Sequence, residues 1–317
     1  MRNIIIGFAA ACLLSACGGG STGSSSSTSV AVNTPKSDCE AEGRRFIDAI
    51  SYCTSLRTMT RSDFYDTVAL IRSSANLPPL VVDARVEDAA FKHANYLYVN
   101  NTIGHDQVIG KPGFYGVKEE DRLWASQYPA TGADEDAAAT SDIAAGFEGL
   151  LSVPYHASLF LKVGPYHMGL GIAGDATGKG GMVVDVANTS SQYTILPKDT
   201  LSIYPCGLSS ISKRSIADEA PAPYPGRNLR TDPIGSLIIM QVPYAQGNNL
   251  QVINISLSET VSKAGVAIAQ PANLLDSSIR IYNATKPLKS TTSYSINVDG
   301  FLSGVAYKRS CTFSTGI

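Results

Sequence analysis

Two histidines stand at the ends of expected helices, where an imidazole can take part in chemistry. The chain has 317 residues but only 4 histidines. His105 follows Gly104 in NTIGHDQ, so its side chain can project from the loop that ends a helix. His156 lies in GLLSVPYHASLFL, where Pro154 breaks or restarts another helix. If those two helices pack side by side, both imidazoles can meet at one end, and neutral imidazoles bind divalent metals well.

Other possible centres are weaker. We expect His93, inside a helix, and His167, at the start of a strand, to be structural or exposed. GLGIAG, residues 169–174, matches G-x-G-x-x-G, but a loop and another strand follow it, so we expect no dinucleotide site. The chain contains no H-E-x-x-H motif, so it lacks this metallohydrolase signature.

Three helices would position the two histidines. The spacing of apolar residues predicts helices over 61–77, 83–101 and 137–152. The first has Ser62 or Asp63 available as its N-cap. Residues 105–136 are rich in Gly and Pro and show no period, which predicts a loop between the second and third helices.

Strand patterns follow the helices. HMGLGIAG and GGMVVDVAN, joined by DATGKG, predict a hairpin over 167–174 and 180–188. From residue 206 onward short alternating segments separated by turn residues predict an all-β sandwich of about one hundred residues. The expected class is therefore α+β, with a helical domain that holds a small antiparallel sheet and an all-β domain behind it.

The N-terminal end predicts export. Residues 4–14 form an apolar run behind Arg2 that is too short to span a bilayer. Leu14-Ser15-Ala16-Cys17 resembles the lipobox of bacterial lipoproteins, which implies cleavage after residue 16 and acylation of Cys17. Gly18 follows, and by the sorting habit of that family the implied location is the outer membrane or cell surface. Residues 17–38, rich in Gly, Ser and Thr, are expected to tether the folded part to the membrane.

The remaining cysteines favour disulfides. Of the 6 cysteines, Cys12 and Cys17 belong to the leader, which leaves Cys39, Cys53, Cys206 and Cys311. No C-x-x-C spacing occurs, and an even number in an exported chain favours disulfides over metal thiolates. Three pairings are open. Proximity favours Cys39–Cys53 and leaves Cys206–Cys311.

The charge balance excludes one class of partner. The formal net charge is −2, and no cluster of Lys and Arg is present. A nucleic-acid-binding or polybasic lipid-binding surface needs such a cluster, so we expect neither surface and no nucleic-acid partner.

Several ordered features resemble the CAP superfamily of cysteine-rich secretory, antigen-five and pathogenesis-related proteins, in particular its bacterial exported branch. They are Leu77-Pro78-Pro79-Leu80 before the second helix, His105 after it, Pro154-Tyr155-His156 after the third, and the GLGIAG strand. The resemblance covers residues 60–190 and implies an αβα sandwich.

The resemblance also implies a site. Many family members carry two histidines and two acidic residues around a central cleft, and some bind zinc there. His105 and His156 match the histidines, Glu135 in GADEDAA is the best match for one carboxylate, and Glu148 is the weak candidate for the other. Ala157 stands where the family usually has arginine, so the set is incomplete. Two imidazoles and a carboxylate can hold Zn²⁺ with a position left open.

The predicted organisation runs from end to end of the chain. It is a signal peptide over 1–16, a tether over 17–38, a CAP domain over 39–200 and an immunoglobulin-like β-sandwich over 206–317. The favoured function is a non-catalytic envelope lipoprotein that binds a lipid, sterol-like or glycan ligand or a surface partner. One alternative is a zinc-assisted hydrolase of peptide or envelope polymer centred on His105, His156 and Glu135. The other is a structural adhesin with a vestigial cleft.

Overall fold

The structure is a computed structural model of the whole chain. It describes residues 58–164, 166–192, 196–197, 199–209, 222–229, 232–243, 249–272 and 277–316, together with the backbone of a short hairpin, β1 (Arg45–Ile47) and β2 (Tyr52–Thr54). The predicted leader, the lipobox with Cys17, and Cys39 lie outside the described residues, and of Cys53 only the backbone is described.

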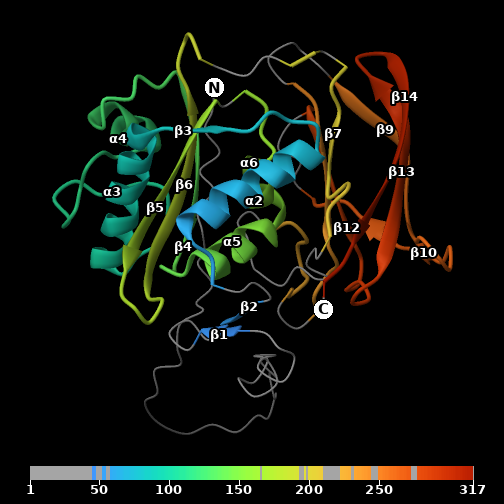
Figure 1. Cartoon of the computed structure of the whole chain (residues 1–317), viewed down its shortest axis with the longest axis horizontal. Helices are drawn as coiled ribbons and strands as arrows, with labels where there is room; N and C mark the ends of the chain where they lie inside the picture. Colours follow the sequence, from blue (N-terminus) through green and yellow to red (C-terminus); the bar gives the residue numbers. More distant parts are fainter. Residues whose placement is uncertain are drawn as a thin grey trace, which may run out of the picture.

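A four-stranded sheet forms the middle of the first domain (Figure 1). Its order is β3 (Val81–Val82), β5 (His167–Gly174), β6 (Gly180–Asn188) and β4 (Gly132–Ala138). The predicted hairpin is confirmed as β5–β6, and β3 joins β5 in parallel. Apolar side chains on β6 alternate between the two faces, so both faces must be covered.

Helices cover both faces of this sheet (Figure 1). One layer holds α3 (Ala84–Asn100) and α4 (Glu119–Ala125), and α3 packs on β5 and β6. The other layer holds α2 (Arg61–Ser74), α5 (Ile143–Leu151) and α6 (Pro154–Leu159). Val184 and Val186 face this second layer, whereas Val183 and Ala187 face α3. The predicted αβα sandwich is confirmed.

Three local predictions need correction. The N-cap of α2 is Thr60, not Ser62 or Asp63, because the Asp63 carboxylate accepts the Thr60 N–H at 2.8 Å while the Thr60 hydroxyl accepts the Asp63 N–H at 3.1 Å. Residues 105–136 are not all loop, since they contain α4 and most of β4. The third helix begins at Ile143 rather than 137, because Asp142 caps it.

Glycines in GLGIAG allow α3 to lie directly on the sheet. A Cβ atom at Gly169 would overlap the backbone of Val86 and Glu87, and one at Gly171 would overlap the backbone of Ala90. Ala89, Ala90 and Ala94 supply the matching small side chains on α3. The glycines of the motif that resembles a dinucleotide fingerprint therefore allow close packing of α3 on β5.

The C-terminal region is a pair of four-stranded sheets. One has the order β11 (Ile268–Ala269), β12 (Ile279–Ala284), β8 (Leu237–Gln241) and β7 (Ser202–Tyr204). The other has β10 (Gly265–Val266), β9 (Leu250–Glu259), β13 (Ser293–Leu302) and β14 (Val305–Ser314). Both sheets contribute to one apolar core, which confirms a β-rich second region. The sequence predicts that this domain starts at residue 206, but β7 already belongs to its first sheet and begins at Ser202.

A disulfide joins the two sheets at their ends. Cys206, just after β7, is bonded to Cys311 on β14, and the two are 105 residues apart in the chain. This is one of the pairings left open by the sequence. It links β7 and β14, the terminal strands in the orders of their sheets.

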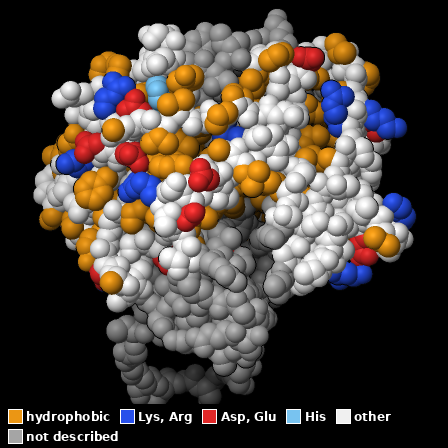
Figure 2. Space-filling model, viewed as in Figure 1, with side chains coloured by type: hydrophobic (Ala, Val, Ile, Leu, Met, Phe, Trp, Pro, Cys, Tyr) orange, Lys and Arg blue, Asp and Glu red, His pale blue; other side chains and the backbone are white. Residues whose placement is uncertain are grey.

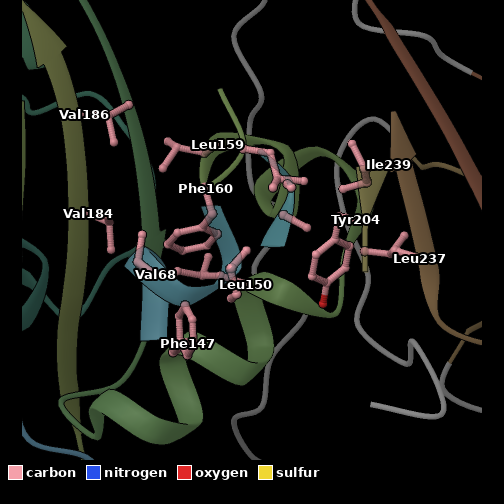
Figure 3. Packing of buried hydrophobic residues seen from close by; sticks show 14 of the residues in the cluster. Val68, Phe147, Leu150, Leu159, Phe160, Val184, Val186, Tyr204, Leu237 and Ile239 are labelled. Atoms are coloured by element: carbon pink, nitrogen blue, oxygen red, sulfur yellow. The ribbon is translucent and has the colours of Figure 1, made fainter. Parts of the chain in front are cut away.

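The two parts of the molecule share an apolar core (Figure 3). Ile238 and Met240 of β8 face the inside of the sandwich, whereas Leu237 and Ile239 face the CAP-like part. They belong to the same apolar cluster as Leu159 of α6 and Phe160, which follows it. Consequently every residue of β8 is buried, and the sandwich is packed on the first domain rather than only linked to it.

Candidate functional site

Glu135 on β4 is the centre of a buried polar cluster. Its Oε2 accepts a hydrogen bond from Arg122 at 2.5 Å, and its Oε1 lies 3.0 Å from His105 Nδ1 and 3.4 Å from His93 Nε2. The side chains of Glu135, Arg122 and His93 are 1%, 0% and 0% exposed, whereas that of His105 is 21% exposed. The cluster therefore reaches solvent chiefly through His105.

Charges in the cluster determine how these groups ionise. Burial alone would raise the pKa of Glu135, but Arg122, His93 and His105 outweigh it and hold this pKa well below its usual range. Burial also opposes protonation of His105, yet the hydrogen bond and charge of Glu135 raise the His105 pKa above its ordinary value. The result is an ionised glutamate bound to a permanently charged guanidinium.

Asp185 on β6 lies beside Glu135 and behaves in the opposite way. The two residues are register partners on β6 and β4. Asp185 is completely buried, and no described group donates a hydrogen bond to either carboxylate oxygen. Burial, followed by the charge of Glu135, raises the pKa of Asp185 well above its usual range. Asp185 is therefore the protonated member of the pair.

His93 fixes the loop that carries His105. Its Nε2 lies 2.9 Å from the Gly104 carbonyl, and its Nδ1 lies 3.0 Å from the Gln107 amide nitrogen. An amide nitrogen can only donate, so Nδ1 accepts and Nε2 carries the proton. Burial lowers the pKa of His93, which favours this neutral tautomer. His93 is thus structural, as expected, but it belongs to the same centre as His105.

The structure brings together only part of the predicted ligand set. His105 and Glu135 are in contact. His156 is buried in α6, and Glu148 lies on α5, so both belong to the helical layer on the other side of the sheet. The sequence predicts that His156 faces His105 across a cleft, whereas the structure separates them by the sheet.

The geometry also bears on zinc. Among the described residues no group of three His, Cys, Asp or Glu side chains is placed to hold a metal ion. Both oxygens of the Glu135 carboxylate have partners: Oε1 contacts His105 and Oε2 accepts from Arg122. A metal ion at Oε2 would have to displace the Arg122 cation. This arrangement does not fit a metal centre at Glu135. Zinc binding stays a prediction.

Apolar side chains of α5 and of the end of α6 belong to the core rather than to an exposed ligand surface. Phe147, Leu150 and Phe160 are at most 3% exposed, and Leu151 packs against the same cluster. Phe147 and Phe160 meet edge to face with ring centroids 5.2 Å apart.

Sequence reasoning did not identify Arg122, Asp185 or Gln107. Asp185 had a signal, since it is the single charge inside the apolar strand GGMVVDVAN. Arg122 and Gln107 carry no such signal, because both lie in the segment predicted to be a loop.

The αβα sandwich with this polar centre under its first helical layer is similar to a known family of domains. Residues 65–187 match the model of the cysteine-rich secretory protein (CAP) family. This domain, about two fifths of the chain, therefore resembles the CAP superfamily. No curated protein matches the chain.

Two solved structures are similar to part of this chain. One is an extracellular protein containing a SCP domain from Bacillus anthracis, with 26% identity and a TM-score of 0.35 over 40% of this chain and 40% of that chain. Another is an outer surface protein from Borrelia burgdorferi, with 20% identity and a TM-score of 0.35 over 41% of this chain and 92% of that chain. This chain thus spans two fifths of the Bacillus protein.

Within the described residues, no helix combines the length and the apolar character needed to cross a membrane.

Proposed function

We propose that this protein is an exported lipoprotein, anchored through acylated Cys17, whose CAP domain works by binding rather than by catalysis. The observation that carries the proposal is the state of Glu135. It is the carboxylate that a hydrolase at His105 would need as general base, but it is buried and ionised against Arg122. A general base has to reach a proton on water or substrate, and a carboxylate held in this way does not.

The sequence supports the membrane location. The lipobox-like segment ends at Cys17, and the Gly/Ser/Thr-rich residues behind it can act as a tether. The ligand class that we favour is lipid or glycan, because an envelope anchor places the domain beside both. The formal net charge of −2 and the absence of a basic cluster argue against nucleic acid.

Incubation with isolated envelope material tests this function. Wild-type protein and the Glu135→Gln variant are mixed separately with purified peptidoglycan and with vesicles of extracted envelope lipid. We expect the wild type to sediment with one of these materials and to release no soluble fragment detectable by mass spectrometry. Fragments released by the wild type but not by Glu135→Gln would establish the hydrolase instead.

Acylation is tested in cells with an alkyne-tagged fatty acid. We expect the label to be incorporated into the wild type and lost in Cys17→Ala. Equal labelling of both proteins would contradict the anchor.

A further inference from the structure

An exposed apolar loop lies next to His105. Val108 and Ile109 are 59% and 76% exposed, Phe114 on the same loop is 37% exposed, and Val99 on the underlying α3 is 47% exposed. Figure 2 shows hydrophobic side chains at the surface over the α3–α4 layer. We call the segment from Val108 to Phe114 the apolar loop.

The apolar loop is held in one conformation from beneath. The Val108 N–H donates to the Tyr96 hydroxyl at 3.0 Å, and the Asn100 amide donates to the Pro112 carbonyl at 2.8 Å. Gly110 and Gly113 have φ angles of +83° and +74°, which turn the chain twice within the loop.

The same buried centre that holds Glu135 also supports this loop. Gln107 contacts His93 through its amide nitrogen, and its amide oxygen accepts the Tyr115 N–H at 2.7 Å. Its backbone N–H donates to the Val117 carbonyl at 2.8 Å. Both ends of the apolar loop are therefore tied to His93 and, through it, to Glu135. Exposed apolar side chains on a preformed loop lose little conformational entropy when they bind.

Charges of both signs surround the apolar loop, but the loop itself carries only Lys111. Asp106 lies before the loop, and Lys118, Glu119, Glu120 and Asp121 lie after it. The Lys92 ammonium, which lies 5.4 Å from the centre of the Tyr115 ring, is paired with Asp88 at 3.9 Å.

These features fit a lipid bilayer better than a protein pocket. Val108 and Ile109 are consecutive and both mostly exposed, so their side chains project from the surface. A bilayer accepts projecting apolar side chains without shape complementarity, and anionic headgroups complement the charge of Lys111.

We propose that the apolar loop inserts into the membrane to which the protein is anchored, with Ile109 in the acyl region and Lys111 among anionic phospholipid headgroups. The inference rests on the proposed lipid anchor. A tether of this kind makes loop insertion an intramolecular event, so a few apolar side chains suffice.

Depth-dependent fluorescence quenching tests the insertion. The chain has a single tryptophan, Trp124, so Ile109→Trp in a Trp124→Phe background reports on one position. The full acylated protein is purified from membranes and reconstituted into vesicles of phosphatidylethanolamine and phosphatidylglycerol with brominated acyl chains. Val305→Trp in the same background is the matched control, because Val305 is an equally apolar side chain, 71% exposed, on β14 of the other domain.

We expect brominated lipid to remove most of the emission of the tryptophan at 109 and to leave that at 305 unchanged. Replacing phosphatidylglycerol by phosphatidylcholine should weaken the quenching at 109. Equal, weak quenching at both positions while both proteins stay on the vesicles would overturn the inference. A blue shift at 109 without quenching would do the same, since it would place that residue against a second copy or another protein. Failure of both variants to float with vesicles would overturn the anchor, and this inference with it.

Discussion

Glu135 on β4 and Asp185 on β6 are cross-strand neighbours whose pKa values are shifted in opposite directions. Arg122 supplies the positive charge that keeps Glu135 ionised, and burial next to that ionised carboxylate keeps Asp185 protonated. A single cation, Arg122, is therefore enough for two buried carboxyl groups, because only the charge of Glu135 has to be balanced.

This relationship predicts how stability depends on pH. Unfolded Asp loses its proton above about pH 3.9, whereas folded Asp185 keeps it to a much higher pH. The folded state therefore binds more protons in this window, and the Asp185 contribution lowers stability as pH rises through it. We expect Asp185→Asn to be more stable than the wild type at pH 8 and to gain less at pH 5, by urea unfolding. A difference that is constant with pH would show that Asp185 is ionised in the folded state.

Arg122 should be essential for folding because it neutralises a buried charge. We expect Arg122→Met to lower the free energy of unfolding by about 3–5 kcal/mol, since it leaves Glu135 buried and unpaired. The double variant Arg122→Met, Glu135→Gln removes both charges and should recover much of this loss. If the double variant is as unstable as the two single losses added together, the Arg122–Glu135 pair is not coupled.

The helix–sheet contact at Gly171 should not tolerate a methyl group. Gly171→Ala places a Cβ on the backbone of Ala90, and overpacking of this kind costs about 1–3 kcal/mol. Gly149→Ala is the control, because a Cβ there meets nothing within 4 Å and Ala favours the helix by about 0.5–1 kcal/mol. Thermal melting should shift down for the first variant and up for the second. A downward shift of equal size in both would mean that packing on α3 is not the cause.

The shared core predicts that the two domains unfold together. Ile239→Ala removes a buried side chain from the contact between the sandwich and α6, and we expect a loss of about 2–5 kcal/mol in one cooperative transition. Ile253→Ala, at a side chain that is 53% exposed, should change stability by less than about 0.5 kcal/mol. Two separate transitions, with the CAP domain unaffected by Ile239→Ala, would show that the domains are independent.

The layer assignment of the histidines can be tested by zinc titration. We expect calorimetry on His105→Ala and His156→Ala to show that the two substitutions do not remove one and the same site, because the sheet separates the residues. A single stoichiometric zinc site that is lost in both variants would contradict this expectation. It would instead establish the metal centre predicted from the sequence.

Sequence reasoning identified the elements whose patterns are strong. The α3 helix, the β5–β6 hairpin and the strands β8, β9, β12, β13 and β14 all carry regular apolar periodicity, and the order of the CAP motifs adds to it. β4 escaped prediction because GADEDAA is polar, and only its place beside β6 explains why Glu135 and Asp136 are buried.

The sequence by itself determined an α+β class, the second β-rich region and a set of disulfide pairings that includes Cys206–Cys311, because local periodicity and cysteine number are read from the chain alone. The αβα arrangement and the choice of His105 and Glu135 as site residues came from the resemblance to the CAP superfamily. The tertiary structure decided which groups share a site. His156 is separated from His105 by the sheet, while Arg122, Asp185 and Gln107 join it from a helix, a strand and a loop. Burial and charge act through space, so only the folded arrangement determines which carboxyl group is ionised and which keeps its proton.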